Sequence, residues 1–337
     1  MKAAVLHGAN DITVEDVPEP EVGPDGVVVK VRACGICGSD LHAYRQGRGD
    51  DLVLGHEFSG DVVEVGRDVT GVAVGDRVTA MSGRGCGECY WCRRGEWLRC
   101  SRMTLFGYGV GGAFAEYTFV PNFLLNKYAV RLSDSVSYET AATTEPLSVA
   151  LYSVMKMQPE PNDDVVVIGA GVIGLCAVQV LKALGIGQVI LSGRRAGRLE
   201  LAKRCGADIV IDGALEDAVS IVYEATSGKG ADIVVECAGS AAAFDQSLRM
   251  VHRGGRIAVV GLYEQPIEWN PNSIVSNDID LIGGGLRFDL PGAMELIEKK
   301  KVDTGYLVTH EFPLADIAKA FETQLTAPDA VKVLVKP

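Results

Sequence analysis

A strand, a glycine-rich turn and the start of a helix follow one another at residues 165–174, and this run constrains the fold more than any other. It reads Val-Val-Val-Ile-Gly-Ala-Gly-Val-Ile-Gly. In a G-x-G-x-x-G pattern the first glycine turns the chain, the second admits a pyrophosphate and the third packs helix on strand. The helix N-terminus then faces the phosphates. The pattern predicts a dinucleotide site, and a purely structural turn is the alternative. The candidate residues are Gly169, Gly171, Val172, Ile173 and Gly174.

Apolar segments of strand length alternate with helical stretches from residue 164 onward. The predicted strands span 165–168, 189–192, 209–211, 233–236, 257–260 and 281–282. This order is typical of an α/β fold with a doubly wound parallel sheet. The first 130 or so residues instead form short alternating segments broken by Gly, Pro and Asp, which predicts a β-rich, barrel-like module. A chain of 337 residues is expected to form two domains. The tail, with a helix at 291–300 and a strand at 331–335, is expected to return to the first module.

The end of the second predicted strand indicates which dinucleotide binds. About 20 residues after the glycine motif, an acidic side chain would hold the ribose 2′-hydroxyl of NAD, whereas an arginine accommodates the 2′-phosphate of NADP. Here the sequence has Ser192, Gly193, Arg194 and Arg195 and no carboxylate. Because a guanidinium forks onto phosphate oxygens, NADP(H) is favoured over NAD(H). The alternative is that both arginines are solvated surface charges.

Four cysteines lie within fifteen residues in a Cys-x2-Cys-x2-Cys-x7-Cys pattern. They are Cys86, Cys89, Cys92 and Cys100. Thiolates at this spacing can close on one tetrahedral ion, so the pattern predicts a structural zinc site with no open position. The spacing disfavours the alternative, a pair of disulfides. A closed site carries no chemistry, so the reactive centre is expected elsewhere.

The composition narrows the class of protein. The formal net charge of -12 argues against nucleic acid as a partner, because a phosphate backbone requires a basic surface. No apolar run has the length needed to cross a bilayer, and residues 1–7 lack the apolar region of a signal peptide. We therefore expect a cytoplasmic protein that binds small molecules and neither nucleic acid nor membrane. Cys176, Cys205 and Cys237 lie in apolar segments and are expected to be buried thiols.

A second set of ligand-type residues lies in the first module. Residues 33–42 read Ala-Cys-Gly-Ile-Cys-Gly-Ser-Asp-Leu-His, and residues 55–58 read Gly-His-Glu-Phe. A thiolate, an imidazole and nearby carboxylates are enough for an open zinc site, in which three protein ligands leave room for water or substrate.

With these motifs the sequence resembles the zinc-dependent medium-chain alcohol dehydrogenases, and within that superfamily it is most similar to sorbitol, threonine and butanediol dehydrogenases. The resemblance runs nearly the full length and includes Glu-Pro-Leu-Ser-Val at 145–149. It implies a GroES-like catalytic domain at 1–147, with a structural zinc lobe at 85–101. It also implies a Rossmann NADP-binding domain at 148–285 and a return to the catalytic domain at 286–337.

The resemblance also implies a set of metal ligands. Carried over by motif, Cys37 and His56 bind the catalytic zinc, and Glu145 matches the carboxylate that takes the third position directly or through water. Glu57 is an adjacent carboxylate that exchanges on and off the metal. Asp40 resembles a residue that orients a ligand. With the cysteine lobe, this implies two Zn2+ per chain, one catalytic and one structural.

The remaining implied roles concern proton and hydride transfer. Ser39 is placed to accept the alcohol's proton, and His42 passes it to water; a capping hydroxyl and a surface histidine are the alternatives. Arg287 resembles an arginine near the substrate pocket, with an ion pair as the alternative. We expect hydride transfer between a secondary alcohol, polyol or vicinal diol and NADP(H), through a zinc-bound alkoxide, to give a ketone or ketose.

Two other functions stay open at this point. An NAD-dependent amino-alcohol dehydrogenase of the threonine type would share every metal residue. A zinc-ribbon binding protein would explain the cysteine lobe but neither the glycine motif nor Cys37 and His56. The resemblance further implies a homo-oligomer, a dimer or a tetramer, formed through a strand at the end of the Rossmann sheet.

Overall fold

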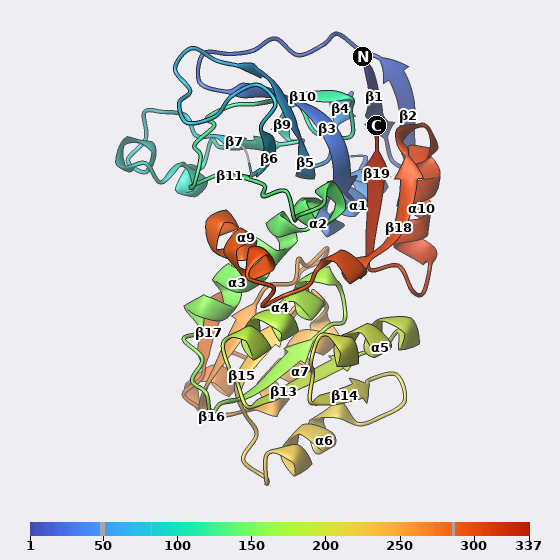
Figure 1. Cartoon of the computed structure of the whole chain (residues 1–337). Coiled ribbons are helices and arrows are strands. Elements are labelled where there is room, and N and C mark those ends of the chain that lie inside the picture. The colour runs from blue at the N-terminus through green and yellow to red at the C-terminus, as the bar shows by residue number, and fades with distance from the viewer. Residues whose placement is uncertain (48–50, 82, 285–286) are drawn as a thin grey trace. The chain divides into compact units, whose positions relative to one another are not determined.

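The computed structural model describes residues 1–47, 51–81, 83–284 and 287–337, which divide into two compact units (Figure 1). The first unit comprises Met1–Glu145, Phe288–Lys300 and Thr304–Pro337, and the second comprises Pro146–Arg287 and Lys301–Asp303. The predicted boundary at 285–286 falls on Gly285 and Leu286, which lie outside the described residues. The division into 1–147, 148–285 and 286–337 therefore stays a prediction.

A seven-stranded sheet forms the centre of the first unit. Its path runs β11-β6-β5-β3-β19-β18, and β10 pairs with β3. The strands are β3 (Val27–Gly35), β5 (Glu57–Val65), β6 (Arg77–Ala80), β10 (Tyr117–Val120), β11 (Ala129–Arg131), β18 (Val308–Pro313) and β19 (Lys332–Lys336). In β19, Leu334 lies opposite Gly35 of β3 in an antiparallel pair. A strand from the end of the sequence thus lies beside the strand that leads into Cys37.

Smaller elements surround this sheet. Two three-stranded sheets have the orders β2-β1-β4 and β7-β8-β9. Their strands are β1 (Lys2–Gly8), β2 (Asp11–Asp16), β4 (Leu52–Val53), β7 (Gly83–Arg84), β8 (Thr104–Phe106) and β9 (Gly109–Val110). The helices are α1 (Gly38–Gln46), α2 (Tyr138–Ala142), α9 (Leu290–Glu298) and α10 (Ile317–Thr326), with 3-10 turns at Cys92–Arg94, Trp97–Arg99, Gly305–Leu307 and Leu314–Asp316. Helix α3 (Thr144–Lys156) begins in the first unit and continues in the second.

Aromatic side chains fill the core of the first unit. Phe58 of β5 stacks on Phe106 of β8 with ring centroids 5.1 Å apart, and Phe114 meets Phe321 of α10 edge to face at 5.7 Å. All four side chains are fully buried. Burial of this much apolar surface fixes the ends of β3 and β5, where the ligand-type residues lie.

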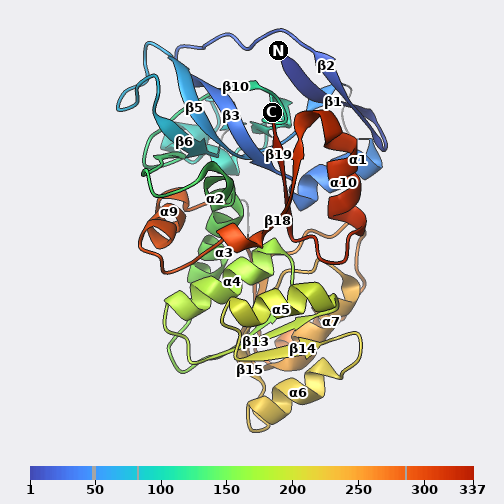
Figure 2. The ribbon, with the colours of Figure 1, turned by 45° about the vertical axis from the view of Figure 1, so that its right-hand side comes forward.

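The second unit is a parallel sheet covered by helices (Figure 2). Its strand order is β14-β13-β12-β15-β16-β17, so the order reverses between β12 and β15. The strands are β12 (Asp164–Ile168), β13 (Gln188–Gly193), β14 (Ile209–Asp212), β15 (Ala231–Glu236), β16 (Val251–Val259) and β17 (Asp280–Gly283). The helices are α4 (Val172–Ala183), α5 (Ala196–Arg204), α6 (Ala218–Ala225), α7 (Ala241–Met250) and α8 (Asn272–Val275). The predicted α/β fold with a doubly wound sheet is confirmed.

One predicted strand differs from the observed one. Residues 257–260 were expected to form it, yet β16 begins at Val251 and includes His252 and Arg253. The polar start of β16 follows β15 through a register shift between Ala231 and Ile233. Pairing with a neighbouring strand therefore extends the element beyond its apolar segment.

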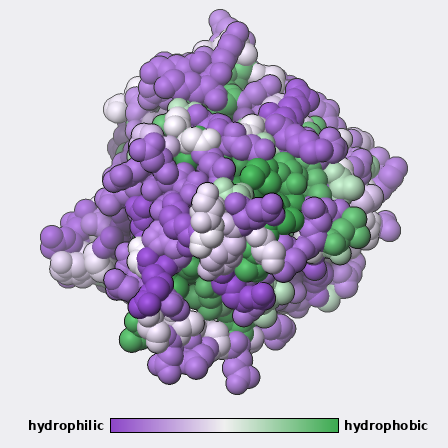
Figure 3. Space-filling model, turned by 90° about the horizontal axis from the view of Figure 1, so that it is seen from below, coloured by the Kyte–Doolittle hydropathy of each residue, from purple (hydrophilic) through white to green (hydrophobic). Residues whose placement is uncertain are grey.

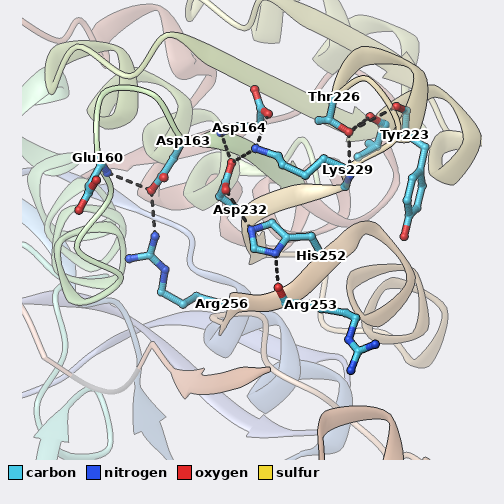
Figure 4. A network of polar contacts seen from close by, with 12 residues as sticks. Glu160, Asp163, Asp164, Tyr223, Thr226, Lys229, Asp232, His252, Arg253 and Arg256 are labelled. Atoms are coloured by element: carbon cyan, nitrogen blue, oxygen red, sulfur yellow. Dashed lines mark hydrogen bonds and ion pairs between the residues drawn. The ribbon is translucent and has the colours of Figure 1, made fainter. Parts of the chain in front are cut away.

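A polar network fixes the amino ends of three adjacent strands in the second unit (Figure 4). Lys229 Nζ lies 2.9 Å from Asp164 at the start of β12 and 2.6 Å from Asp232 in β15. His252 Nε2 of β16 lies 2.9 Å from the second oxygen of Asp232. Arg256 pairs with Asp163 at 2.9 Å. These contacts lie at the end of the sheet opposite to the glycine turn.

Most of the face shown in Figure 3 is polar, and apolar side chains gather in one part of it. Exposed large apolar residues of the second unit include Leu262, Val275 and Leu281, which follow or belong to β16, α8 and β17. Among the described residues, no helix has both the length and the apolar character needed to cross a membrane.

Candidate active site

Cys37 stands at the junction between β3 and α1. Its backbone N–H donates to Asp40 Oδ2 at 2.9 Å, so Asp40 caps the helix that Cys37 precedes. This contact fixes the Cys37 backbone and buries the Asp40 carboxyl completely. Ser39 and His42 lie on α1, three residues apart and both partly buried, so they share one side of the helix.

His56 and Glu57 lie where the chain enters β5. Gly55 precedes them with a φ of 93°, and a Cβ there would come within 2.8 Å of Cys34 Sγ. Only glycine fits this turn. Ligand atoms of Cys37, His56 and Glu57 all lie within 4.8 Å of one another. We call these three residues the ligand group.

The chemistry of the ligand group fits a zinc ion. A thiolate, an imidazole and a carboxylate are all ligands that zinc takes in proteins. Asp40 Oδ1 lies 3.5 Å from His56 Nδ1, and both atoms are buried without a hydrogen bond among the described residues. Burial opposes protonation of His56, but the charges of Asp40 and Cys37 outweigh it and raise the pKa of His56 well above its usual value. A bound cation would replace that proton as the balancing charge.

Lys332 of β19 is a part of the site that sequence reasoning missed. Its Nζ pairs with Glu57 Oε2 and donates to the carbonyl of Ile36 at 2.8 Å, and both charged side chains are 1% exposed. A Cβ on Gly35 would lie 2.3 Å from Glu57 Oε2, so the glycine makes room for the pair. The only signal in the sequence was a lysine inside an apolar strand, since a buried lysine needs an acidic partner.

Glu145 begins α3 and is 5% exposed. It is not a member of the ligand group, although the charges of His56 and Glu57 act on it. Burial raises the pKa of Glu145 to about 7, against the opposing effect of His56. Arg287, the predicted pocket residue, is partly buried and belongs to the second unit. The metal role of Glu145 and the substrate role of Arg287 stay predictions.

The four cysteines of the lobe gather as the spacing predicts. Sulfur atoms of Cys86, Cys89, Cys92 and Cys100 lie within 4.8 Å of one another. Backbone N–H groups point at the sulfurs, as in the 3.4 Å bonds from Cys86 to Cys100 and from Cys92 to Cys89. Backbone hydrogen bonds from Glu88 and Cys89 lower the pKa of Cys86 to about 6. None of these four cysteines forms a disulfide, and this donor set is that of a closed zinc site.

The glycine turn between β12 and α4 has the features that the sequence predicts. Gly169 has a φ of 111°, and a Cβ on Gly174 would lie 1.9 Å from the Gly169 carbonyl oxygen. A Cβ on Gly171 would instead meet nothing within 4 Å. The first and third glycines are therefore needed for turn and packing, and the second leaves space beside the N-terminus of α4, where Val172 and Ile173 begin the helix.

A cluster of arginines follows β13. Ser192 and Gly193 are buried, and a Cβ on Gly193 would come within 2.8 Å of Ala170, whereas Arg194 and Arg195 are exposed. Arg198 on α5 is a third member that sequence reasoning missed. Burial and the charge of Arg195 lower the pKa of Arg198 to about 10. Helical spacing from the N-cap Arg195 brings the two guanidiniums together, a signal already present in the sequence.

Comparison with known proteins gives the same picture for both units. The family model for the alcohol dehydrogenase GroES-like domain matches residues 23–129, and the model for zinc-binding dehydrogenases matches residues 172–299. The chain is 38% identical to a sorbitol dehydrogenase of Halalkalibacterium halodurans over 100% of this chain and 99% of that protein.

Solved structures agree. A zinc-binding dehydrogenase from Sinorhizobium meliloti bound to NADP superposes with a TM-score of 0.90 at 32% identity, over 100% of this chain and 99% of that one. The 2R,3R-butanediol dehydrogenase of Bacillus subtilis gives a TM-score of 0.89 at 33% identity with the same coverage.

Proposed function

Because the chain belongs to the zinc-dependent medium-chain alcohol dehydrogenases, we propose that it transfers hydride between NADP(H) and a secondary alcohol, polyol or vicinal diol. The gathering of Cys37, His56 and Glu57 around a buried Asp40 carries this proposal. The products in the oxidative direction are a ketone or ketose. As a dehydrogenase, the chain is not the zinc-ribbon binding protein that the cysteine lobe alone would allow.

Cys37 and His56 would hold the catalytic zinc, with Glu145 or Glu57 as the carboxylate ligand. Zinc supplies a Lewis acid that lowers the pKa of an alcohol hydroxyl. The Asp40 carboxylate, 3.5 Å from His56 Nδ1, would orient the imidazole through its charge, and the Lys332 ammonium would balance the charge of Glu57. Four-cysteine coordination in the lobe would bring the total to two zinc ions per chain.

Ser39 and His42 would move the proton of the alcohol. The Ser39 hydroxyl would accept it at Oγ while releasing its own proton to His42, one helical turn further on, and His42 would pass a proton to water. Arg287 would contact the oxygen-rich end of the substrate.

The second unit would bind the dinucleotide at the glycine turn. Backbone N–H groups at the start of α4 would donate to the pyrophosphate, for which Gly171 leaves space. Arg194, Arg195 and Arg198 offer three guanidiniums to a ribose 2′-phosphate, and residues 192–195 at the end of β13 include no carboxylate to hold a free 2′-hydroxyl. NADP(H) is therefore favoured over NAD(H).

We also propose a cytoplasmic homo-oligomer. Within the described residues, β17 ends its sheet and pairs with β16 alone, and its Leu281 is 38% exposed. An exposed edge with apolar side chains is a template for a second copy. Light scattering of the purified protein distinguishes monomer, dimer and tetramer.

The experiment that tests the function is a substrate screen with NADP+ and NAD+, run with metal analysis on the same sample. Polyols, vicinal diols and simple secondary alcohols are compared with L-threonine, and reduced-nicotinamide absorbance is followed. Turnover of a polyol or diol with two zincs per chain supports the proposal. Turnover of L-threonine alone identifies the amino-alcohol alternative, and no turnover with any alcohol contradicts both.

Cofactor choice is tested with Arg194→Ala and Arg195→Ala. Each loses a phosphate partner, so the ratio of kcat/KM for NADP+ to that for NAD+ should fall about tenfold. Lys203→Ala on α5 is the matched control, because that exposed lysine pairs with Glu200. An NAD+ preference that neither arginine variant alters would contradict the assignment.

A further inference from the structure

Tyr108 lies in a tight turn between β8 and β9 that holds its backbone rigidly. Gly107 and Gly109 flank it with φ values of 77° and 90°. The Tyr108 N–H donates to the carbonyl of Leu105 at 2.8 Å, and the Leu105 N–H donates back to Tyr108 at 3.1 Å. Paired in both directions, the Tyr108 backbone is held in one conformation.

The Tyr108 ring faces the ligand group. Its centroid lies 6.4 Å from that of His56. Burial is the main influence on the phenol, and the Asp40 carboxylate adds to it; together they raise the pKa of Tyr108 far above its usual value. The Ser39 side chain is close enough to act on the phenol, but the two hydroxyls do not meet hydrogen-bond geometry. The phenol therefore lies beside the proposed proton acceptor.

The Tyr108 hydroxyl oxygen is buried and has no hydrogen-bond partner among the described residues. A buried hydroxyl without a partner is costly, and native structures retain few of them. A phenylalanine would fill the same space without that cost. The hydroxyl is explained if a bound molecule supplies the acceptor, and its position next to His56 and Ser39 makes that molecule the substrate.

We propose that the Tyr108 hydroxyl donates a hydrogen bond to a second oxygen of the substrate, on the carbon next to the reacting one. The reacting oxygen would be held by the ligand group and Ser39, so a further donor beside His56 is left to recognise a neighbouring hydroxyl. Tyr108 thereby selects vicinal diols and polyols over simple secondary alcohols. This inference rests on the proposed function and refines its substrate class.

The test compares Tyr108→Phe with the native enzyme on a matched pair of substrates. 2,3-Butanediol and 2-butanol differ only by the second hydroxyl. Losing one buried hydrogen bond should lower kcat/KM for the diol about 10-fold to 100-fold and leave that for 2-butanol within about threefold. The control is Tyr117→Phe, which removes a phenol from β10 of the same unit and should change neither value.

A binding measurement gives a second readout. Calorimetric titration of the diol into the zinc-loaded enzyme saturated with NADPH should show weaker affinity for Tyr108→Phe, with 2-butanol unaffected. Equal losses on both substrates would make Tyr108 part of the proton relay or the scaffold and overturn the inference, as would no loss on either. If the native enzyme oxidises no alcohol, the proposed function itself fails. If the native enzyme is active and Tyr108→Phe keeps the same preference for the diol over 2-butanol, this inference is wrong and the proposed function stands.

Discussion

The cysteine lobe and the ligand group both gather residues that suit zinc, but they do so in opposite ways. The lobe takes four identical ligands from residues 86–100, and its sulfurs are neutralised locally by backbone N–H groups. The ligand group takes three different ligands, and a buried aspartate and a buried lysine surround it. The lobe is complete within one short segment, whereas the ligand group also depends on the charge of Lys332 from a strand near the end of the sequence. A catalytic zinc site with an open position needs the second arrangement, because neighbouring protein groups must orient the ligands and balance their charges.

The largest effect should follow removal of His56. His56→Ala deletes one ligand and unbalances Asp40, so turnover should fall by about a thousandfold or more. Zinc content should drop from two ions per chain to one, while circular dichroism stays native. His310→Ala, a partly buried histidine elsewhere in the first unit, serves as the control. If His56→Ala keeps both zinc ions and full turnover, the ligand group is not the catalytic zinc site.

Lys332→Met tests whether the ligand group depends on long-range charge. It leaves Glu57 buried and unpaired, which should lower the free energy of unfolding by about 3 to 5 kcal/mol. Chemical denaturation measures this, with Lys319→Met as the control because Lys319 is an exposed lysine of α10. Wild-type stability in Lys332→Met would mean that Glu57 is already balanced by another group.

Asp40→Asn keeps the shape of the side chain and removes its charge. Because Asp40 orients both Cys37 and His56, zinc affinity at the ligand group should weaken about 10-fold to 100-fold. Competition with a chelating dye reports this affinity, and the lobe should keep its ion throughout. Asp245→Asn, at an exposed residue of α7, is the matched charge change. Equal loss of both ions would show that Asp40 does not act on the ligand group alone.

The smallest effect on catalysis should come from the lobe. Cys92→Ser opens the closed site, so zinc should fall from two ions to one and amide exchange should quicken at residues 85–101. In protein that keeps its fold and assembly, kcat/KM should stay within about threefold of wild type. Cys205→Ser, in the second unit, should keep both ions. Loss of hydride transfer in a folded Cys92→Ser protein would show that the lobe does more than support structure.

The features that could be predicted from sequence are those written in short stretches. The glycine motif, each of the six parallel strands and the cysteine cluster are short segments of sequence. Local geometry determines the conformation of such segments. Cys37, His56 and Glu57 were found because their motifs are short, although only the fold brings them together.

Lys332 and Tyr108 escaped prediction for the opposite reason. Lys332 contacts Glu57, which lies 275 residues earlier in the sequence. The Tyr108 hydroxyl stands out only because the fold buries it without a partner among the described residues, and no local sequence pattern predicts that. Arg198 was within reach, since its helical spacing from Arg195 is plain in the sequence. Partners that meet through sheet pairing are hidden until the register of β19 on β3 is known.

The pairing of β19 with β3 determines when the site can be completed during synthesis. The second unit is nearly continuous in sequence, so its sheet can complete while the ribosome is still at work. Glu57 must wait for a lysine 275 residues later, roughly 14 to 55 s at ordinary elongation rates. During that interval Glu57, which is buried in the folded protein, has no Lys332 to balance its charge. The unit that carries the ligand group is therefore completed last, after the sheet of the second unit.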